Sequence, residues 1–260
     1  MQFTPDADVD ELLGSLLDRM RQILGGKLVG LYLYGSLVTG DFDRQCSDID
    51  LLAVTSADID EQEFERLREM HNDFVVQNPK WDDRIEIAYV SAAALRTFRS
   101  QASQIAIISP GEPFHGKEAG KDWLINWWTV REKGVALYGP APATLIDPIS
   151  QEEFLHAVRE QAREWRTWVY HMHKRPAQAY AILTMCRALY ASRNGEQASK
   201  KQAARWAQEC LPQWAPLIQN ALGWRAAWRD EAVDHPATFP ETVRFVHFVT
   251  DQITGHPAGQ

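Results

Sequence analysis

Two short apolar runs near the start of the chain are joined by a polar segment. A glycine and a serine follow the first run, and two aspartates lie at the start of the second. The first run, residues 28–34, ends at Gly35-Ser36, as a buried strand ends in a turn. The second run, residues 49–55, is headed by Asp48 and includes Asp50. Residues two apart in a strand point to the same face, so we expect the two carboxylates side by side. The pattern predicts two strands whose polar chemistry is concentrated beside the segment that joins them.

These polar groups suit a magnesium ion and a phosphate chain. Glycine allows close approach of a phosphate to the backbone, and Ser36 offers a hydroxyl and an N–H to phosphate oxygens. Two adjacent carboxylates repel each other unless a cation lies between them, and Mg²⁺ prefers carboxylate and phosphate oxygens. The alternative for Asp48 is a turn or cap, whereas Asp50 lies in an apolar run, where an unpaired carboxylate is costly. We therefore expect Asp48 and Asp50 to be metal ligands in a site for Mg-ATP.

A third carboxylate lies in a later strand. Residues 84–90 alternate as a strand does, with Ile85 and Ile87 facing one way. Glu86 faces the other way, among small apolar side chains. It is a candidate partner of the aspartate pair, and the alternative is an ion pair with Arg84.

Gly-Ser followed by Asp-x-Asp resembles the signature of the nucleotidyltransferase superfamily, which has the polymerase β-like fold. Members use the two aspartates as metal ligands and often take a third carboxylate from a later strand. The resemblance implies Mg²⁺ on Asp48 and Asp50, ATP as co-substrate, and Glu86 as the general base. The candidate nucleotide-binding residues in this half are Gly35, Ser36 and Ser47.

Further blocks follow along the chain at residues 135–142, 145–148, 151–155, 181–190, Lys200, 203–207 and 245–248. In this order they resemble the aminoglycoside (3'')(9)-adenylyltransferases. The resemblance implies transfer of AMP from ATP to a hydroxyl of an aminoglycoside or aminocyclitol antibiotic, with release of pyrophosphate. It also implies that Arg187 and Lys200 reach the ATP phosphates, as a fork and a point charge suited to triphosphate.

One departure from the family bears on the substrate. Members that modify streptomycin carry acidic residues before the block at 181–190, and a tryptophan in the loop after the catalytic strand. Here the first stretch reads Arg175-Pro-Ala-Gln178, and the second, Ser109–His115, has no tryptophan. Because a polycationic drug needs carboxylates to replace its hydration, we expect spectinomycin to be favoured over streptomycin.

The predicted fold class is α+β. A nucleotidyltransferase domain with a mixed sheet and helices is expected over residues 1–145, and an all-α domain that binds substrate and clamps ATP over 146–260. Pro- and Gly-containing stretches at 139–142 and 147–148 indicate the boundary. Residues 101–120 are expected to form a surface loop with a short strand-like segment. Predicted helices are 8–24, 60–77, 121–133, 150–172, 176–192, 199–210, 213–229 and 239–253.

Composition excludes several classes of protein. The 45% apolar and 24% charged content of the 260 residues is that of a globular protein, and no apolar run has the length of a membrane span. The net charge of −8 argues against general nucleic-acid binding and is compatible with a cationic substrate. No signal peptide is visible, and the three cysteines have no metal-binding spacing. We expect a cytoplasmic monomer with reduced thiols.

Two other functions fit the same residues. One is AMP transfer to a non-drug acceptor such as a protein, which would label a macromolecule instead of a small molecule. The other is a non-catalytic, ATP-binding regulatory module or an antitoxin-like partner. Such antitoxins are usually much shorter than this chain, and the three acidic residues speak against an inactive enzyme.

Overall fold

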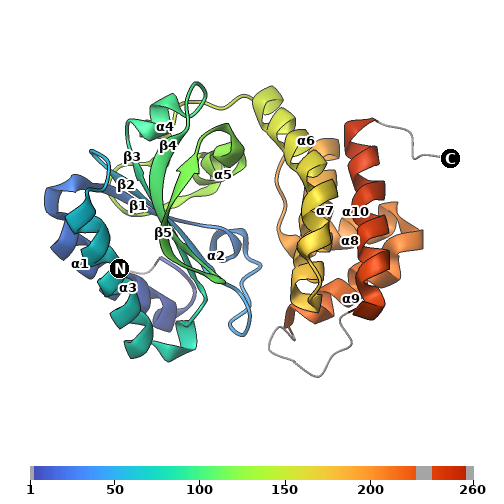
Figure 1. The fold of residues 1–260 in the computed structure, drawn as a ribbon, viewed down its shortest axis with the longest axis horizontal. Helices are drawn as coiled ribbons and strands as arrows, with labels where there is room; N and C mark the ends of the chain where they lie inside the picture. Colours follow the sequence, from blue (N-terminus) through green and yellow to red (C-terminus); the bar gives the residue numbers. More distant parts are fainter. Residues whose placement is uncertain (1–2, 227–235, 256–260) are drawn as a thin grey trace. The chain divides into compact units, whose positions relative to one another are not determined.

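The computed structural model describes residues 3–226 and 236–255, and its contacts divide the chain into two compact units (Figure 1). The first unit is Met1–Phe42 with Ser47–Ile149, and the second is Asp43–Cys46 with Ser150–Gln260. Among the described helices, none has the length and apolar character required to cross a bilayer.

A mixed sheet of six strands forms the centre of the first unit, in the order β5-β4-β3-β2-β1-β6. Strands β2 and β3 run parallel, and the other neighbouring pairs are antiparallel. The predicted mixed sheet in an α+β fold is therefore confirmed. The strands are β1 (Leu28–Tyr34), β2 (Ile49–Thr55), β3 (Ile85–Ser91), β4 (Ser103–Ser109), β5 (Glu112–Ala119) and β6 (Val135–Tyr138).

Two long helices, α1 (Ala7–Leu24) and α3 (Glu61–Gln77), lie side by side against one face of this sheet (Figure 1). Each begins at an aspartate whose side chain accepts a hydrogen bond from a backbone N–H of the first turn, Asp6 for α1 and Asp60 for α3. Their apolar stripes share one core with alternate residues of β1, β2 and β3. The shorter helices of this unit are α2 (Ser36–Thr39), α4 (Ala94–Thr97) and α5 (Leu124–Lys133).

The predicted alternation of β3 is confirmed. Ile85, Ile87 and Tyr89 belong to the core that packs on α1 and α3. Glu86 is half-buried and, because side chains alternate across a strand, lies on the opposite face. One face of the sheet is thus closed by α1 and α3, and the carboxylate belongs to the other.

The prediction for residues 101–120 is confirmed for the strand-like segment Ile105–Ile108, which lies within β4, and wrong for the surface loop. These residues form the hairpin β4–β5, with Gly111 at a φ of 81° in the turn. Strand β5 carries Pro113 and Gly116, which weaken a strand pattern in the sequence. It lies at the edge of the sheet and pairs only with β4 among the described strands, so a proline is tolerated there.

The second unit consists of helices. The central helix is α7 (Arg175–Asn194), which contacts each of the other four. Its buried residues occur on every side, and many are alanines that allow close approach of neighbouring helices. The others are α6 (Gln151–Trp168), α8 (Lys200–Cys210), α9 (Ala215–Ala226) and α10 (Phe239–Thr254).

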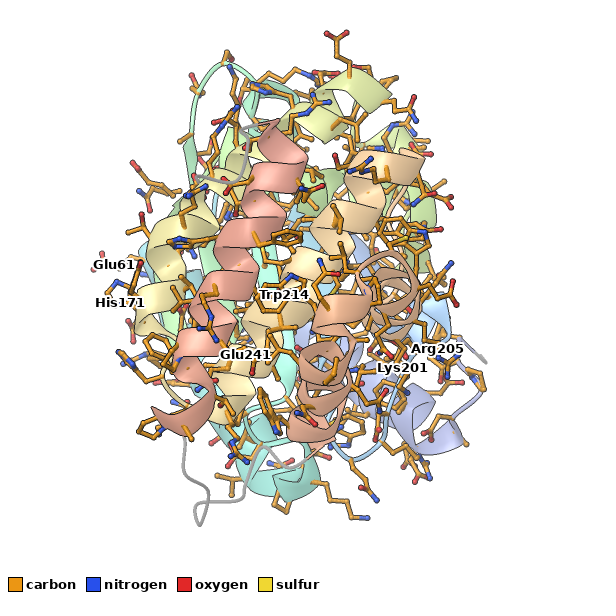
Figure 2. The ribbon with its side chains drawn as sticks, turned by 90° about the vertical axis from the view of Figure 1, so that its right-hand side faces the viewer. Glu61, His171, Lys201, Arg205, Trp214 and Glu241 are labelled. Atoms are coloured by element: carbon orange, nitrogen blue, oxygen red, sulfur yellow. The ribbon has the colours of Figure 1, made fainter. Side chains whose placement is uncertain are left out.

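All five helices predicted after residue 146 are present. The first ends earlier than expected, at Trp168, and continues as a 3₁₀ turn over Val169–His171. The last residues of the helix predicted over 213–229 lie outside the described residues. Just before α9, Trp214 packs its ring on Phe245 and Phe248 of α10, with centroids 5.4 and 5.7 Å away (Figure 2).

Candidate active site

The three central strands bring a row of polar side chains together on the sheet face opposite α1 and α3. In the antiparallel pair β1–β2, Tyr34 is opposite Asp50. In the parallel pair β2–β3, Asp50 is opposite Glu86. Residues opposite one another on adjacent strands share a face and have neighbouring side chains. The two carboxylates that the sequence analysis singled out on separate strands are therefore neighbours.

The turn after β1 closes tightly over this row. Gly35 has a φ of 70°, and a Cβ added to it would lie 1.8 Å from Asp50 Oδ2. Both the backbone conformation and the space require glycine. The next residue, Ser36, has a buried Oγ without a hydrogen-bond partner. A buried hydroxyl of this kind is available to an incoming ligand, and its contact with phosphate stays a prediction.

Asp48 lies two residues before Asp50 and is held in place through its neighbour Ser47. Ser47 is fully buried, and its carbonyl accepts hydrogen bonds from Arg84 Nε at 3.0 Å and Nη2 at 2.5 Å. The Ile49 N–H donates in turn to the Arg84 carbonyl at 2.9 Å. The Ser47 backbone therefore helps to hold the site in shape, and Arg84 fixes the position of the segment that leads into β2.

The Arg84 guanidinium also donates to the Lys80 carbonyl at 3.4 Å and lies 4.7 Å from the centre of the Trp81 ring. These contacts show what Arg84 does in the fold: it ties the segment before β3 to the segment before β2. Sequence reasoning treated this arginine only as a possible ion-pair partner of Glu86 and missed its contact with Ser47.

Electrostatics provides a second measure of how closely the acids gather. The pKa of Tyr34 is raised well above its usual 10.0, first by burial and then by the negative charges of Glu86 and Asp50. The hydrogen bond to Glu86 and the charge of Asp48 raise the pKa further. All three predicted acids therefore act on one phenol. Sequence reasoning missed Tyr34, although its place directly before Gly35 at the end of an apolar strand was a usable signal.

The donor set fits a magnesium ion that is shared with a phosphate chain. Mg²⁺ is usually bound by one or two carboxylates, with substrate phosphates and water completing the octahedron. Asp48 and Asp50 supply such a pair, next to the unpartnered Ser36 hydroxyl. In the part of the chain that the structure describes, no group of three His, Cys, Asp or Glu side chains is arranged as a ready metal cage.

The two basic candidates, Arg187 and Lys200, lie in the helical unit, half-buried on α7 and at the first position of α8. Arg187 Nε donates to the Ala198 carbonyl at 3.2 Å, so α7 holds the segment that leads into α8. Lys200 Nζ lies 5.4 Å from the centre of the Tyr180 ring. The fold therefore gathers both cations at one end of α8.

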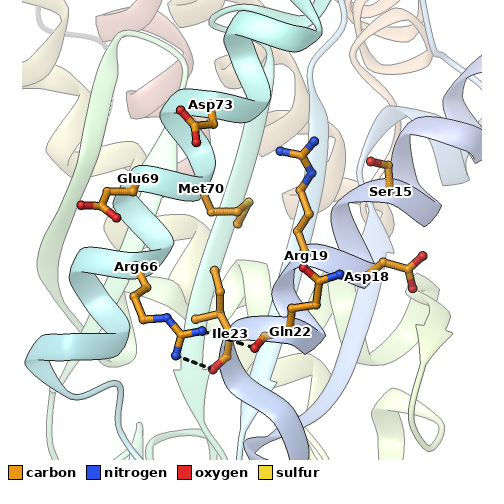
Figure 3. Close-up of a pocket in the computed structure, with 9 residues that line it drawn as sticks. All are labelled: Ser15, Asp18, Arg19, Gln22, Ile23, Arg66, Glu69, Met70 and Asp73. Carbon is orange, nitrogen blue, oxygen red and sulfur yellow. Dashed lines mark hydrogen bonds between the residues drawn. The ribbon is translucent and has the colours of Figure 1, made fainter.

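A separate groove of about 690 Å³ lies between α1 and α3 (Figure 3). Arg66 donates across it to the carbonyls of Gln22 and Ile23, at 3.4 and 3.5 Å. Its walls carry the basic side chains of Arg19 and Arg66 together with acids such as Asp18 and Glu69. Since α1 and α3 cover the other face of the sheet, this groove is distinct from the carboxylate row.

Two sequence-family models match separate parts of the chain. A nucleotidyltransferase domain matches residues 13–104, and the C-terminal domain of aminoglycoside adenylyltransferase matches residues 144–252. The chain thus combines a nucleotidyltransferase domain with the C-terminal domain of aminoglycoside adenylyltransferase, and it is similar to the aminoglycoside (3'')(9)-adenylyltransferases. It is a nucleotidyltransferase, as the sequence analysis predicted.

Curated members of this family are similar over most of their length. An aminoglycoside (3'')(9) adenylyltransferase of Escherichia coli is 29% identical over 270 residues, covering 95% of this chain and 96% of the relative. A spectinomycin 9-adenylyltransferase of Staphylococcus aureus (strain Mu50 / ATCC 700699) is 24% identical over 204 residues, 74% of this chain and 75% of the relative.

A solved structure shares the fold. It is that of spectinomycin adenyltransferase AAD(9) from Enterococcus faecialis with ATP and spectinomycin. The match has a TM-score of 0.70 at 17% identity and covers 91% of this chain and 98% of that chain. The predicted combination of a nucleotidyltransferase domain and a helical C-terminal region is therefore confirmed.

Proposed function

We propose that this enzyme transfers AMP from Mg-ATP to a hydroxyl of an aminoglycoside or aminocyclitol antibiotic, with spectinomycin favoured over streptomycin. The observation that carries the proposal is the pairing of Asp50 with Glu86 beside the Gly35-Ser36 turn. It places two carboxylates next to a turn whose Ser36 hydroxyl is available to bind phosphate.

Glu86 has the role of general base. Its carboxylate accepts the proton of the substrate hydroxyl while that oxygen attacks the α-phosphorus of ATP. The new bond joins the substrate oxygen to phosphorus, and the bond from phosphorus to the β-phosphate oxygen breaks to release pyrophosphate. Much of the acceleration comes from alignment, for which a row of side chains on packed strands is suited.

The residues of the turn and of the β2 entry bind the nucleotide. Gly35 and Ser36 line the triphosphate, the fully buried Ser47 supports the nucleotide site from behind through its backbone, and Asp48 and Asp50 hold the metal. Bound Mg²⁺ supplies positive charge to the phosphate oxygens, where negative charge builds up during the transfer. The unpartnered Ser36 Oγ supports this assignment because a phosphate oxygen is a suitable acceptor for it.

The helical half completes the nucleotide site in this proposal. Residues 1–145 act as the nucleotidyltransferase domain, and residues 146–260 act as the domain that binds substrate and clamps ATP. Arg187 and Lys200 contact the phosphates. Their common location at the start of α8 supports a shared ligand, since two cations held near each other favour a polyanion.

The preference for spectinomycin rests on two stretches. At the start of α7, Gln178 is fully buried, and its side-chain oxygen accepts from the hydroxyls of Thr238 and Thr242. Arg175, at the head of the same helix, places its guanidinium 5.3 Å from the Trp224 ring centre. This stretch is basic and structural, so it offers no carboxylate to a polycationic drug. The relatives named for spectinomycin and the solved structure with spectinomycin are consistent with the choice.

The test is pyrophosphate release from Mg-ATP with spectinomycin, streptomycin and unrelated aminoglycosides. We expect release that depends on spectinomycin, is abolished by Asp50→Asn, and is retained by Asp58→Asn, a matched change of an exposed aspartate after β2. Release with streptomycin as the better substrate would overturn the preference. Failure of every drug to stimulate release, despite ATP binding, would overturn drug modification and direct attention to a protein acceptor, detectable as labelled macromolecule.

The general base is tested separately. Glu86→Gln keeps the shape of the side chain but cannot accept the proton as a carboxylate does. We expect loss of most drug-dependent turnover at saturating ATP with little change in ATP binding. Full activity of this variant would show that the base is another group.

The proposed working form is a monomer in the cytoplasm, where Mg-ATP is available. Light scattering on the purified chain, with and without ATP and spectinomycin, is expected to give the mass of one chain. A dimeric mass in both conditions would overturn this assignment without affecting the proposed reaction.

A further inference from the structure

Tyr34 is a polar side chain beside the carboxylates that the proposed reaction does not use. It ends β1, directly before Gly35, and is 7% exposed. Its hydroxyl lies 3.4 Å from Oε1 of Glu86, and its strand partner is Asp50. The Tyr34 hydroxyl therefore reaches Glu86 from the β1 side of the sheet, whereas β4 lies on the other side of β3.

The direction of this hydrogen bond follows from the charges. An ionised carboxylate can only accept, so the phenol must donate. A phenol has an ordinary pKa of about 10, so the Tyr34 hydroxyl keeps its proton at neutral pH. Tyr34 therefore cannot itself take the substrate's proton, but it can hold the group that does.

We propose that Tyr34 is a positioning residue for AMP transfer, whose hydroxyl fixes the rotamer of the Glu86 carboxylate toward the acceptor hydroxyl. A glutamate has three rotatable bonds, and fixing them in one arrangement lowers the entropy lost in reaching the transition state. The inference rests on the proposed function, because it assumes that Glu86 is the base.

The same strand provides a matched control. Tyr32 lies two residues earlier, on the same face of β1, and is fully buried. Its hydroxyl donates to the Pro140 carbonyl at 3.0 Å instead of to a carboxylate. Tyr34→Phe and Tyr32→Phe each leave a buried phenyl ring in the same strand. Only Tyr34→Phe removes a hydrogen bond to Glu86.

The experiment measures kcat and KM for ATP and spectinomycin in Tyr34→Phe and Tyr32→Phe, together with their thermal unfolding. We expect Tyr34→Phe to lower kcat about tenfold, the effect of about one hydrogen bond to a charged group, with both KM values within about twofold. Tyr32→Phe should keep kcat within about twofold. An unchanged kcat in Tyr34→Phe, or an equal loss in Tyr32→Phe, would overturn the inference.

A double-mutant cycle with Glu86→Gln separates positioning from a general effect on the sheet. If Tyr34 acts through Glu86, then Tyr34→Phe should cause no further loss in the Glu86→Gln background. A tenfold loss in both backgrounds would show that Tyr34 acts on something else. If Glu86→Gln loses turnover and Tyr34→Phe keeps the wild-type turnover, this inference alone is rejected. If Glu86→Gln is fully active, the assignment of Glu86 as the base is itself rejected.

Two unnatural residues keep the test decisive if Tyr34→Phe does not fold. 4-Aminophenylalanine at position 34 retains a donor in the same place, and 4-methylphenylalanine fills the same volume without one. We expect the amino variant to keep kcat near the wild-type value and the methyl variant to lose about tenfold. Equal kcat values for the two would overturn the inference.

Discussion

Gln178 in the helical unit and Ser36 in the sheet unit each bury polar atoms, and only those of Gln178 have hydrogen-bond partners. In the helical unit, Gln178 accepts from Thr238 and Thr242 and donates to the His173 carbonyl at 2.7 Å. In the sheet unit, Ser36 has a buried hydroxyl with no partner, beside a carboxylate that admits no side chain at Gly35. A buried polar group whose hydrogen bonds are made stabilises a fold, whereas one without a partner beside charged groups indicates a ligand site.

The strongest test of this difference is at the turn. Gly35→Ala would place a methyl group against Asp50 Oδ2 and strain a φ of 70°, so we expect turnover to fall by about a thousandfold. The control is Gly40→Ala, where φ is 73° but no atom lies within 4 Å of the added Cβ. It separates the strain of the backbone from the collision. Activity retained in Gly35→Ala would mean that the turn does not have to fit against Asp50.

The second test concerns the opposite face of the sheet, where a buried polar pair has its hydrogen bond made, as Gln178 does. His71 Nε2 lies 2.8 Å from the Tyr89 hydroxyl, and burial lowers the pKa of His71 from 6.5 to about 4. The unfolded chain binds the proton more readily, so the stability contributed by neutral His71 is complete above about pH 6.5. It is lost as the pH falls toward 4, by about 3 kcal/mol in total.

Denaturant unfolding between pH 7.5 and 4 measures this effect. We expect His71→Gln to remove that part of the pH dependence, and His156→Gln, at an exposed position on α6, to leave it intact. Identical pH profiles for wild type and His71→Gln would show that His71 is not the titrating group.

The third test compares Gln178 with an exposed glutamine of the same unit. Gln178→Leu removes the acceptor of the two threonine hydroxyls, and we expect it to lower the free energy of unfolding by about 2 kcal/mol. Gln202→Leu, on the exposed face of α8, should change that free energy by less than about 0.5 kcal/mol. Drug-dependent turnover by the folded Gln178→Leu fraction should be unchanged. A selective loss of turnover without loss of stability would assign Gln178 to the substrate site.

The smallest effect is expected at Arg84. Arg84→Lys keeps the charge but loses the fork that donates twice to the Ser47 carbonyl, so we expect kcat to fall about fivefold through a looser Asp48–Asp50 segment. The control is Arg96→Lys, since Arg96 donates to the Ala92 carbonyl outside the site. Equal kcat values for both variants would show that Arg84 stabilises the fold without tuning the site.

The carboxylate site was predictable because its signals are local. Asp48 and Asp50 are close in sequence, and Glu86 is the one acid in an alternating strand, so strand periodicity alone assigned its face. The neighbouring relation of Asp50 and Glu86 then needed only the pairing of two strands, which the structure supplies as a parallel ladder. The metal-binding role of Asp48 and Asp50 and the base role of Glu86 stay predictions. So do the contacts of Arg187 and Lys200 with phosphate.

The missed features depend on partners far away in the chain. Strand β5 exists because β4 offers it an edge to pair with, and its Pro113 hid it from a pattern-based prediction. Strand β6 is four residues long and is stabilised by antiparallel pairing with β1. Tyr34 approaches Glu86 across two strand pairings, and no spacing in the sequence encodes such a contact.

The sequence by itself determined the periodicity of the main strands and helices, the identities of the three acids, and the presence of a glycine turn before Ser36. These properties depend on side-chain alternation, backbone freedom and the cost of burying charge, which act over a few residues. Tertiary structure alone decided which strands are neighbours, which edge accepts β5, and which phenol and arginine support the carboxylates. The reason is physical: hydrogen-bond ladders and packing join segments far apart in the chain, and their partners are chosen only when the whole sheet forms.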